Sequence, residues 1–273
     1  MKFARIVNMD LVRSVRKRRN PWLEILHAVF NVVFVSAVFG LVLWFPNGPP
    51  WIALALVLLS KWRTLAVRPR HWWANFLANL PDLLLGFSVV ILMWSATVMT
   101  NNALPTQIAL AILYAAWLIF LKPQHKKHLV ILQAGLVQFV AISAVFAISY
   151  LLPVWIIVML TFIIGFAVAR QVFGLFEERH KSFLASVWGL TVSELAFVAW
   201  HWTIAYQITA GLRIPAYAII IMLLGIVAIA TYESYQKHTH VRLKDIQLPL
   251  VFASLAVLII LLLFSGLWDA ATL

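Results

Sequence analysis

Long apolar stretches alternate with short polar ones along almost the whole chain. A helix that crosses a membrane needs about 20 mainly apolar residues, within a range of about 17–25. The pattern predicts about nine such helices. They cover roughly residues 22–45, 51–67, 75–99, 107–121, 128–152, 154–174, 182–206, 214–235 and 247–268. We therefore expect an all-α, polytopic integral membrane helix bundle, with residues 21–273 forming a single transmembrane domain.

The polar connections fall into two sets that alternate along the chain. One set is rich in lysine and arginine and comprises residues 1–20, 61–70, 122–128, 170–181 and 233–245. The other set carries Arg213 alone, so all but one of the 21 basic residues share one face. Short basic connections stay in the cytoplasm. This indicates a cytoplasmic (inner) membrane, the N-terminus inside and the C-terminus outside.

The first 20 residues are predicted to form a basic cytoplasmic tail. Apolar residues interleave with the basic ones, as in an amphipathic helix that lies on anionic lipid headgroups at the cytoplasmic face. The alternative is a plain charged anchor that sets the topology, and we favour it. The apolar run at 22–45 is longer than the core of a signal peptide, usually 7–15 residues, so we interpret it as a retained first span.

Composition narrows the class of protein further. Hydrophobic residues make up 64% of the chain and charged residues 11%, which excludes an ordinary soluble domain. The chain has no cysteine, so disulfides and thiolate metal sites are excluded. The net charge of +12 is explained by the topology, and we predict no nucleic-acid partner. The partners that we expect are the lipid bilayer and anionic lipids.

Polar residues in the first three spans form the first candidate site. They are Glu24, His27 and Asn31 on one helix face, Asn75, Asn79 and Asp82 on another, and Lys61 and Arg63 between them. Neighbouring antiparallel helices pack together, so these faces can meet in a polar pocket. Lys61, Arg63, Arg68 and Arg70 would bind an anion, with Asp82 and Asn79 beside them. The favoured alternative is an internal ion pair between Lys61 and Glu24 or Asp82.

The second segment is unusual because its apolar stretch ends early. Lys61 lies only about 15 Å below Trp51 at 1.5 Å per residue. Either Lys61 and Arg63 reach toward the surface or a polar cavity, or the segment is re-entrant. A re-entrant segment would invert every later span, which the alternation of charge opposes.

Thr191, Glu194 and His201 form the second candidate site, on one face of the seventh span. Glu194 is near the membrane midplane, where an ionised carboxylate is costly. Glutamate and histidine aligned in this way are the parts of a proton relay. The alternative is a protonated Glu194 bonded to another helix, with His201 as an ordinary interfacial residue.

Motifs that would identify an enzyme are absent from the sequence. There is no H-E-x-x-H, no G-x-S-x-G and no glycine-rich phosphate loop. We therefore predict no catalytic residues, no metal and no cofactor.

The segment that runs from Lys61-Trp62-Arg63 through Arg68-Pro69-Arg70 to Asn75, Asn79 and Asp82 resembles uncharacterised multi-span membrane proteins of Saccharibacteria-type bacteria. The resemblance implies a bacterial membrane protein and no activity.

Three functions are compatible with these residues. The first is a carrier or binding protein for a small or lipid-linked anionic substrate, with proton coupling through Glu194. The alternative is a non-catalytic membrane scaffold subunit of a larger complex, in which polar residues join helices. The third is an intramembrane transferase that acts on a lipid-linked substrate.

Overall fold

Nine α-helices and one β-hairpin account for most of the residues that the computed structural model describes, which are 21–45, 48–62, 66–123, 126–202, 204–209 and 211–263. The helices are α2 (Pro21–Trp44), α3 (Trp51–Leu59), α4 (Trp72–Met99), α5 (Leu104–Ala116), α6 (Lys127–Ala147), α7 (Val154–Leu175), α8 (Lys181–His201), α9 (Ala216–His238) and α10 (Leu243–Leu263). Shorter turns are η2 (Pro69–His71), η3 (Trp117–Leu121) and η4 (Ser149–Leu151). The predicted basic tail, residues 1–20, lies outside the described part.

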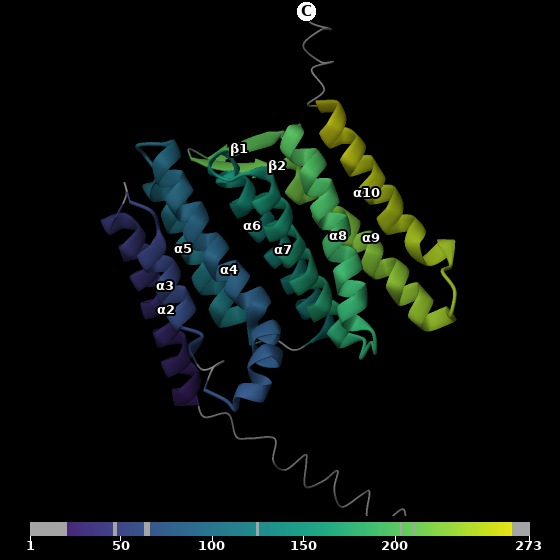
Figure 1. Ribbon diagram of the computed structural model, residues 1–273, viewed down its shortest axis with the longest axis horizontal. Helices are drawn as coiled ribbons and strands as arrows, with labels where there is room; N and C mark the ends of the chain where they lie inside the picture. Colours follow the sequence, from purple (N-terminus) through teal and green to yellow (C-terminus); the bar gives the residue numbers. More distant parts are fainter. Residues whose placement is uncertain are drawn as a thin grey trace, which may run out of the picture.

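Eight of these helices are long and apolar enough to cross a membrane, α5 being continued by η3. Their side chains are apolar toward both the neighbouring helices and the exterior, as a bilayer requires. This confirms the predicted all-α polytopic bundle. The helices stand side by side in Figure 1, where α2 begins at the lower edge and α10 ends at the upper edge. We call the lower edge the basic end.

The second predicted span is helical over only part of its length. Helix α3 has nine residues, about 14 Å, and ends at Leu59. The next element that the structure describes is η2, and α4 begins at the same edge as α2 in Figure 1. Helix α3 is shorter than the roughly 17 residues that a membrane-spanning helix needs.

The β-hairpin was not predicted from the pattern. Strands β1 (Ala205–Thr209) and β2 (Leu212–Pro215) pair antiparallel after α8, with Tyr206 opposite Ile214. Gly211 in the turn has φ +84°, a conformation that glycine adopts without strain. The pairing satisfies backbone groups that would otherwise lie unbonded between two spans.

Helices α7 and α8 approach each other at two glycines. A Cβ atom added at Gly189 would lie 2.9 Å from the carbonyl oxygen of Phe162, and one added at Gly165 would lie 3.0 Å from the Cα of Gly189. Small residues of this kind let two helix backbones pack in direct contact in membranes. The contact fixes α8 against the middle of the bundle.

Gly189→Ala is expected to lower the free energy of unfolding by about 1–3 kcal/mol, because the new methyl group meets backbone rather than a movable side chain. Gly174→Ala in α7 is the matched control, since a Cβ there has open space around it. The control should leave stability unchanged or raise it by up to about 1 kcal/mol. Thermal unfolding of the purified protein in detergent measures both. Equal stability of the two variants would contradict the close contact.

Candidate functional site

Three charged side chains from three different segments meet in the basic half of the bundle. Lys61 follows α3, Asp82 lies in α4, and Lys122 follows η3. Lys61 donates a hydrogen bond to Oδ2 of Asp82. The Nζ atom of Lys122 lies 2.8 Å from the same oxygen. We call these three residues the lysine–aspartate cluster.

Each segment is irregular where it reaches the cluster. Helix α3 ends two residues before Lys61. In α4, Pro81 precedes Asp82 and has no N–H for the carbonyl of the preceding turn, which breaks the helical bonding there. The turn η3 is a π-helix, and the N–H of Lys122 donates to the carbonyl of Trp117 five residues earlier. Such π segments are frequent at functional sites.

The π turn is held in place from a neighbouring helix. Gln133 of α6 donates from Nε2 to the carbonyl of Leu121, directly before Lys122. Without this bond the carbonyl would be left unpaired at the end of a helix inside the membrane. The position of Lys122 beside Asp82 therefore depends on α6 as well as on α5.

The cluster carries more positive than negative charge. Two ammonium groups share one carboxylate oxygen, while Oδ1 of Asp82 is buried and has no hydrogen-bond partner among the described residues. The side chains of Lys61 and Asp82 are only 16% and 18% exposed. Lys122 is 40% exposed and opens the cluster toward the basic end.

The other residues of the first predicted site are distributed around the cluster. Asn79 lies one turn before Asp82, and its Nδ2 donates to the carbonyl of Asn75 at 2.9 Å. Arg68 and Arg70 are exposed at η2, where Nε of Arg70 donates to His71. Arg63 lies outside the described residues. The structure thus joins Lys61 with Asp82 and leaves the two arginines at the surface.

The polar face of α2 carries the remaining residues of the first predicted site. Glu24 and His27 are exposed on α2, and Nδ2 of Asn31 is 3.2 Å from Nε2 of His27. Lys61 meets the α4 face at Asp82. Of the two ion pairs offered as the alternative for Lys61, the structure contains the one with Asp82.

The second predicted site lies on the exposed side of α8. Glu194 is exposed, and its neighbours along this stripe are apolar, including Leu190 and Phe197. Thr191 donates to the carbonyl of Val187, and Nδ1 of His201 donates to the carbonyl of Phe197 at 2.9 Å. The three residues share a face, as the spacing predicts, and that face points away from the bundle interior.

Lys122 is the cluster member that sequence reasoning missed, because it was counted only as a charge that sets topology. The sequence feature that could have indicated the role of Lys122 is the short length of the apolar segment 107–121. A short span draws its flanking charges toward the hydrocarbon, so Lys122 had to find a partner at that depth.

Comparison of the chain with protein-family models, curated proteins and solved structures finds no match. The resemblance to membrane proteins of Saccharibacteria-type bacteria stays a prediction. Among the described residues, no three histidine, aspartate or glutamate side chains come together as they would around a metal ion.

Asp82→Asn is expected to lower the free energy of unfolding by about 3 kcal/mol, because two ammonium groups then face each other without a carboxylate. Lys122→Met should cost less than about 1 kcal/mol, since a neutral Lys61–Asp82 pair remains. Chemical denaturation of the purified protein in detergent measures both. Equal losses would show that the cluster does not hold the segments together.

Single cysteines test whether water reaches Glu194, since the chain contains no other cysteine. Cysteine at 191, 194 or 198 should resist a membrane-impermeant maleimide from either side of a vesicle, because the surrounding stripe is apolar. Cysteine at the exposed Lys181 is the control and should react. Labelling at 194 would instead support the predicted proton relay of Thr191, Glu194 and His201.

Proposed function

We propose that the chain is a carrier or binding protein for a small or lipid-linked anionic substrate, bound at the lysine–aspartate cluster. The observation that carries the proposal is the sharing of one carboxylate oxygen by Lys61 and Lys122. A structural ion pair needs one cation for each carboxylate. The second lysine is available to a ligand that brings its own negative charge.

The chemistry of the cluster suits a phosphate or carboxylate group. Ammonium groups donate charge-assisted hydrogen bonds to such oxygens, and these bonds are roughly twice as strong as neutral ones. Asp82 keeps the two lysines close together when no anion is bound, which removes part of the cost of assembling them. Arg68 and Arg70, exposed at the same end, add positive potential that attracts anions from solution.

The backbone around the cluster supports a carrier in particular. In many transporters, interrupted helices surround the substrate site, because their free backbone groups line it and their segments can move separately. Here the end of α3, the proline in α4 and the π turn η3 coincide at one cluster. Membrane helices that only pack against one another are usually continuous, so three interruptions at one place favour a functional role.

Glu194 favours a second candidate function, a membrane scaffold. Exposing a carboxylate to lipid on an apolar stripe costs free energy. This cost is smaller when a partner protein donates a hydrogen bond to the carboxylate. In that case α8 would contact another membrane protein. The cysteine experiment above separates this possibility from a proton relay, because a protein contact excludes water.

Binding of inorganic phosphate to the purified protein in detergent tests the proposal by calorimetry, with decyl phosphate as the lipid-like probe. Lys122→Gln should weaken binding at least about tenfold, because a charge-assisted hydrogen bond is lost. Lys181→Gln, an exposed lysine at the same end, is the matched control and should bind as the wild type does. A preference for decyl phosphate would identify the substrate as lipid-linked.

Transport is measured next, as the release of labelled probe from proteoliposomes. Release faster than from protein-free vesicles, and slowed by Lys122→Gln, is expected of a carrier. Saturable binding without release would leave a binding protein. The proposal fails if Lys122→Gln binds both probes as tightly as the wild type, or if chloride displaces them at equal concentration.

A further inference from the structure

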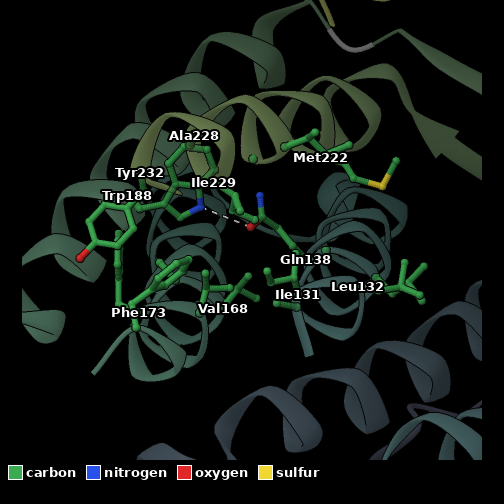
Figure 2. A pocket seen from close by; sticks show the side chains of 18 of the residues that line it. Ile131, Leu132, Gln138, Val168, Phe173, Trp188, Met222, Ala228, Ile229 and Tyr232 are labelled. Atoms are coloured by element: carbon green, nitrogen blue, oxygen red, sulfur yellow. Dashed lines mark hydrogen bonds between the residues drawn. The ribbon is translucent and has the colours of Figure 1, made fainter. Parts of the chain in front are cut away.

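A large apolar cavity lies in the second half of the bundle, apart from the lysine–aspartate cluster. Its volume is about 350 Å³, and residues of α6, α7, α8 and α9 line it. This volume is within the range of ligand sites, about 300–1,000 Å³. Figure 2 shows Val168 and Phe173 on one side, Ile131 and Leu132 on another, and Ala228 and Ile229 of α9 across from them.

Aromatic contacts close the cavity toward the basic end. The ring of Tyr232 lies edge-on to Phe173 and Phe176, with centroids 5.0 and 4.9 Å away. Lys127 lies over the ring of Phe176 at 4.1 Å and pairs with Glu233 at 3.0 Å. These contacts tie α6, α7 and α9 together at this end. The space above them is therefore a defined chamber rather than a loose gap between helices.

The flank of the cavity faces the exterior. Leu132 of α6 and Ile226 of α9 line it and are about half exposed. In a membrane this flank is in contact with lipid. A lipid-soluble molecule can thus enter sideways between α6 and α9 without crossing a polar surface.

One polar group inside the cavity has no partner. Gln138 is 3% exposed, and its Oε1 accepts a hydrogen bond from Nε1 of Trp188 at 3.3 Å. Because the indole N–H can only donate, the amide oxygen must face Trp188, and the orientation of the amide is fixed. Its nitrogen, with two N–H donors, is buried without a partner among the described residues. In Figure 2 the amide nitrogen of Gln138 lies off the dashed line that joins the amide oxygen to Trp188.

The remaining hydrogen-bonding groups deep in the lining are occupied. The indole N–H of Trp188 is used by Gln138. The hydroxyl of Tyr232 donates to Glu178 and accepts from Gln236. In the connection outside the spans, the bond from Tyr232 holds the pKa of Glu178 below its ordinary value. His128 also lines the cavity, but it is exposed at the start of α6, so a ligand deep in the chamber would find the amide of Gln138 as its hydrogen-bond donor.

The depth of Gln138 decides which ligand can use this donor. Gln138 lies about 16 Å along α6 from Lys127, and half the hydrocarbon thickness is about 15 Å. The ester carbonyls of a phospholipid lie at the membrane surface and do not reach this depth. The acceptor must instead belong to a molecule that is soluble within the hydrocarbon itself.

We propose that the chamber between α6, α7, α8 and α9 binds a neutral, lipid-soluble molecule with a carbonyl oxygen on an apolar body, such as a quinone, and that Gln138 donates a hydrogen bond to that oxygen. The apolar walls hold the body and Gln138 sets its orientation. Two donors on the amide nitrogen remain for one or two acceptor oxygens. This site does not depend on the anion site proposed above.

Native mass spectrometry of the full chain in detergent tests the site with decylubiquinone. One molecule should bind each chain saturably. Gln138→Leu should weaken this binding about tenfold, the effect of one lost hydrogen bond to a buried donor. The matched probe n-decylbenzene lacks the carbonyls and should bind wild type and Gln138→Leu equally. Thermal unfolding of each variant checks that it is folded.

Glycines in the lining provide a test that keeps the amide intact. A Cβ at Gly135 meets nothing within 4 Å, and one at Gly225 meets only Trp188, at 3.8 Å. Leucine at either position fills the chamber and should abolish binding. Gly40→Leu on the exposed side of α2 is the control, because a Cβ there also has open space. Lys122→Gln should bind decylubiquinone normally, which separates this site from the anion site.

Three results would overturn the assignment. Unchanged binding by Gly135→Leu and Gly225→Leu would place the ligand elsewhere. Equal binding of decylubiquinone by wild type and Gln138→Leu would remove the role of the amide. Displacement of decylubiquinone by palmitate at lower concentration would identify an acyl chain as the occupant instead of a quinone-like carbonyl compound.

Discussion

The pairing of Asp82 with two lysines is the interaction on which the first half of the bundle depends. A charge within the membrane must be compensated where it lies, since lipid offers no water to solvate it. Lys61 follows a helix that stops short, and Lys122 follows a span that is itself short. Both lysines therefore follow directly on short apolar segments, which draw flanking charges toward the hydrocarbon. A carboxylate in the next helix gives both a partner and brings α3, α4 and α5 together.

The same constraint explains the polar groups of the second half. Several serine and threonine side chains in the spans donate to carbonyls of their own helices, as Ser143 and Thr161 do. Tyr217 donates to the carbonyl of Val192 across two helices. Among the described residues, Arg170 Nε and Gln171 Oε1 of α7 are also buried without a partner, but the amide nitrogen of Gln138 is the one that belongs to a residue lining the chamber. A ligand oxygen that accepts a hydrogen bond from this nitrogen would explain why the nitrogen has no partner in the protein.

The sequence predicted the helices well because span length and basic connections are determined by the bilayer itself. It could not show where α3 ends, since an apolar run that includes Trp51–Leu59 looks the same whether the helix continues or stops. The hairpin at 205–215 was hidden for a similar reason, as its residues are apolar enough to extend the neighbouring spans. Spacing placed Asp82 and Lys61 near each other. It could not add Lys122, whose contact depends on the π turn and on Gln133 in a distant helix.

Helix α6 forms a wall shared by the two proposed sites. Gln133 on one side bonds to the carbonyl of Leu121, next to Lys122, and Gln138 faces the chamber. These residues are five positions apart, hence about 8 Å along one rigid helix. The carbonyl that Gln133 holds belongs to the residue directly before Lys122, so α6 supports the backbone that carries this lysine. A ligand in the chamber would contact the same helix on its other side. Helix α6 therefore contributes a residue to the support of the first site and one to the lining of the second.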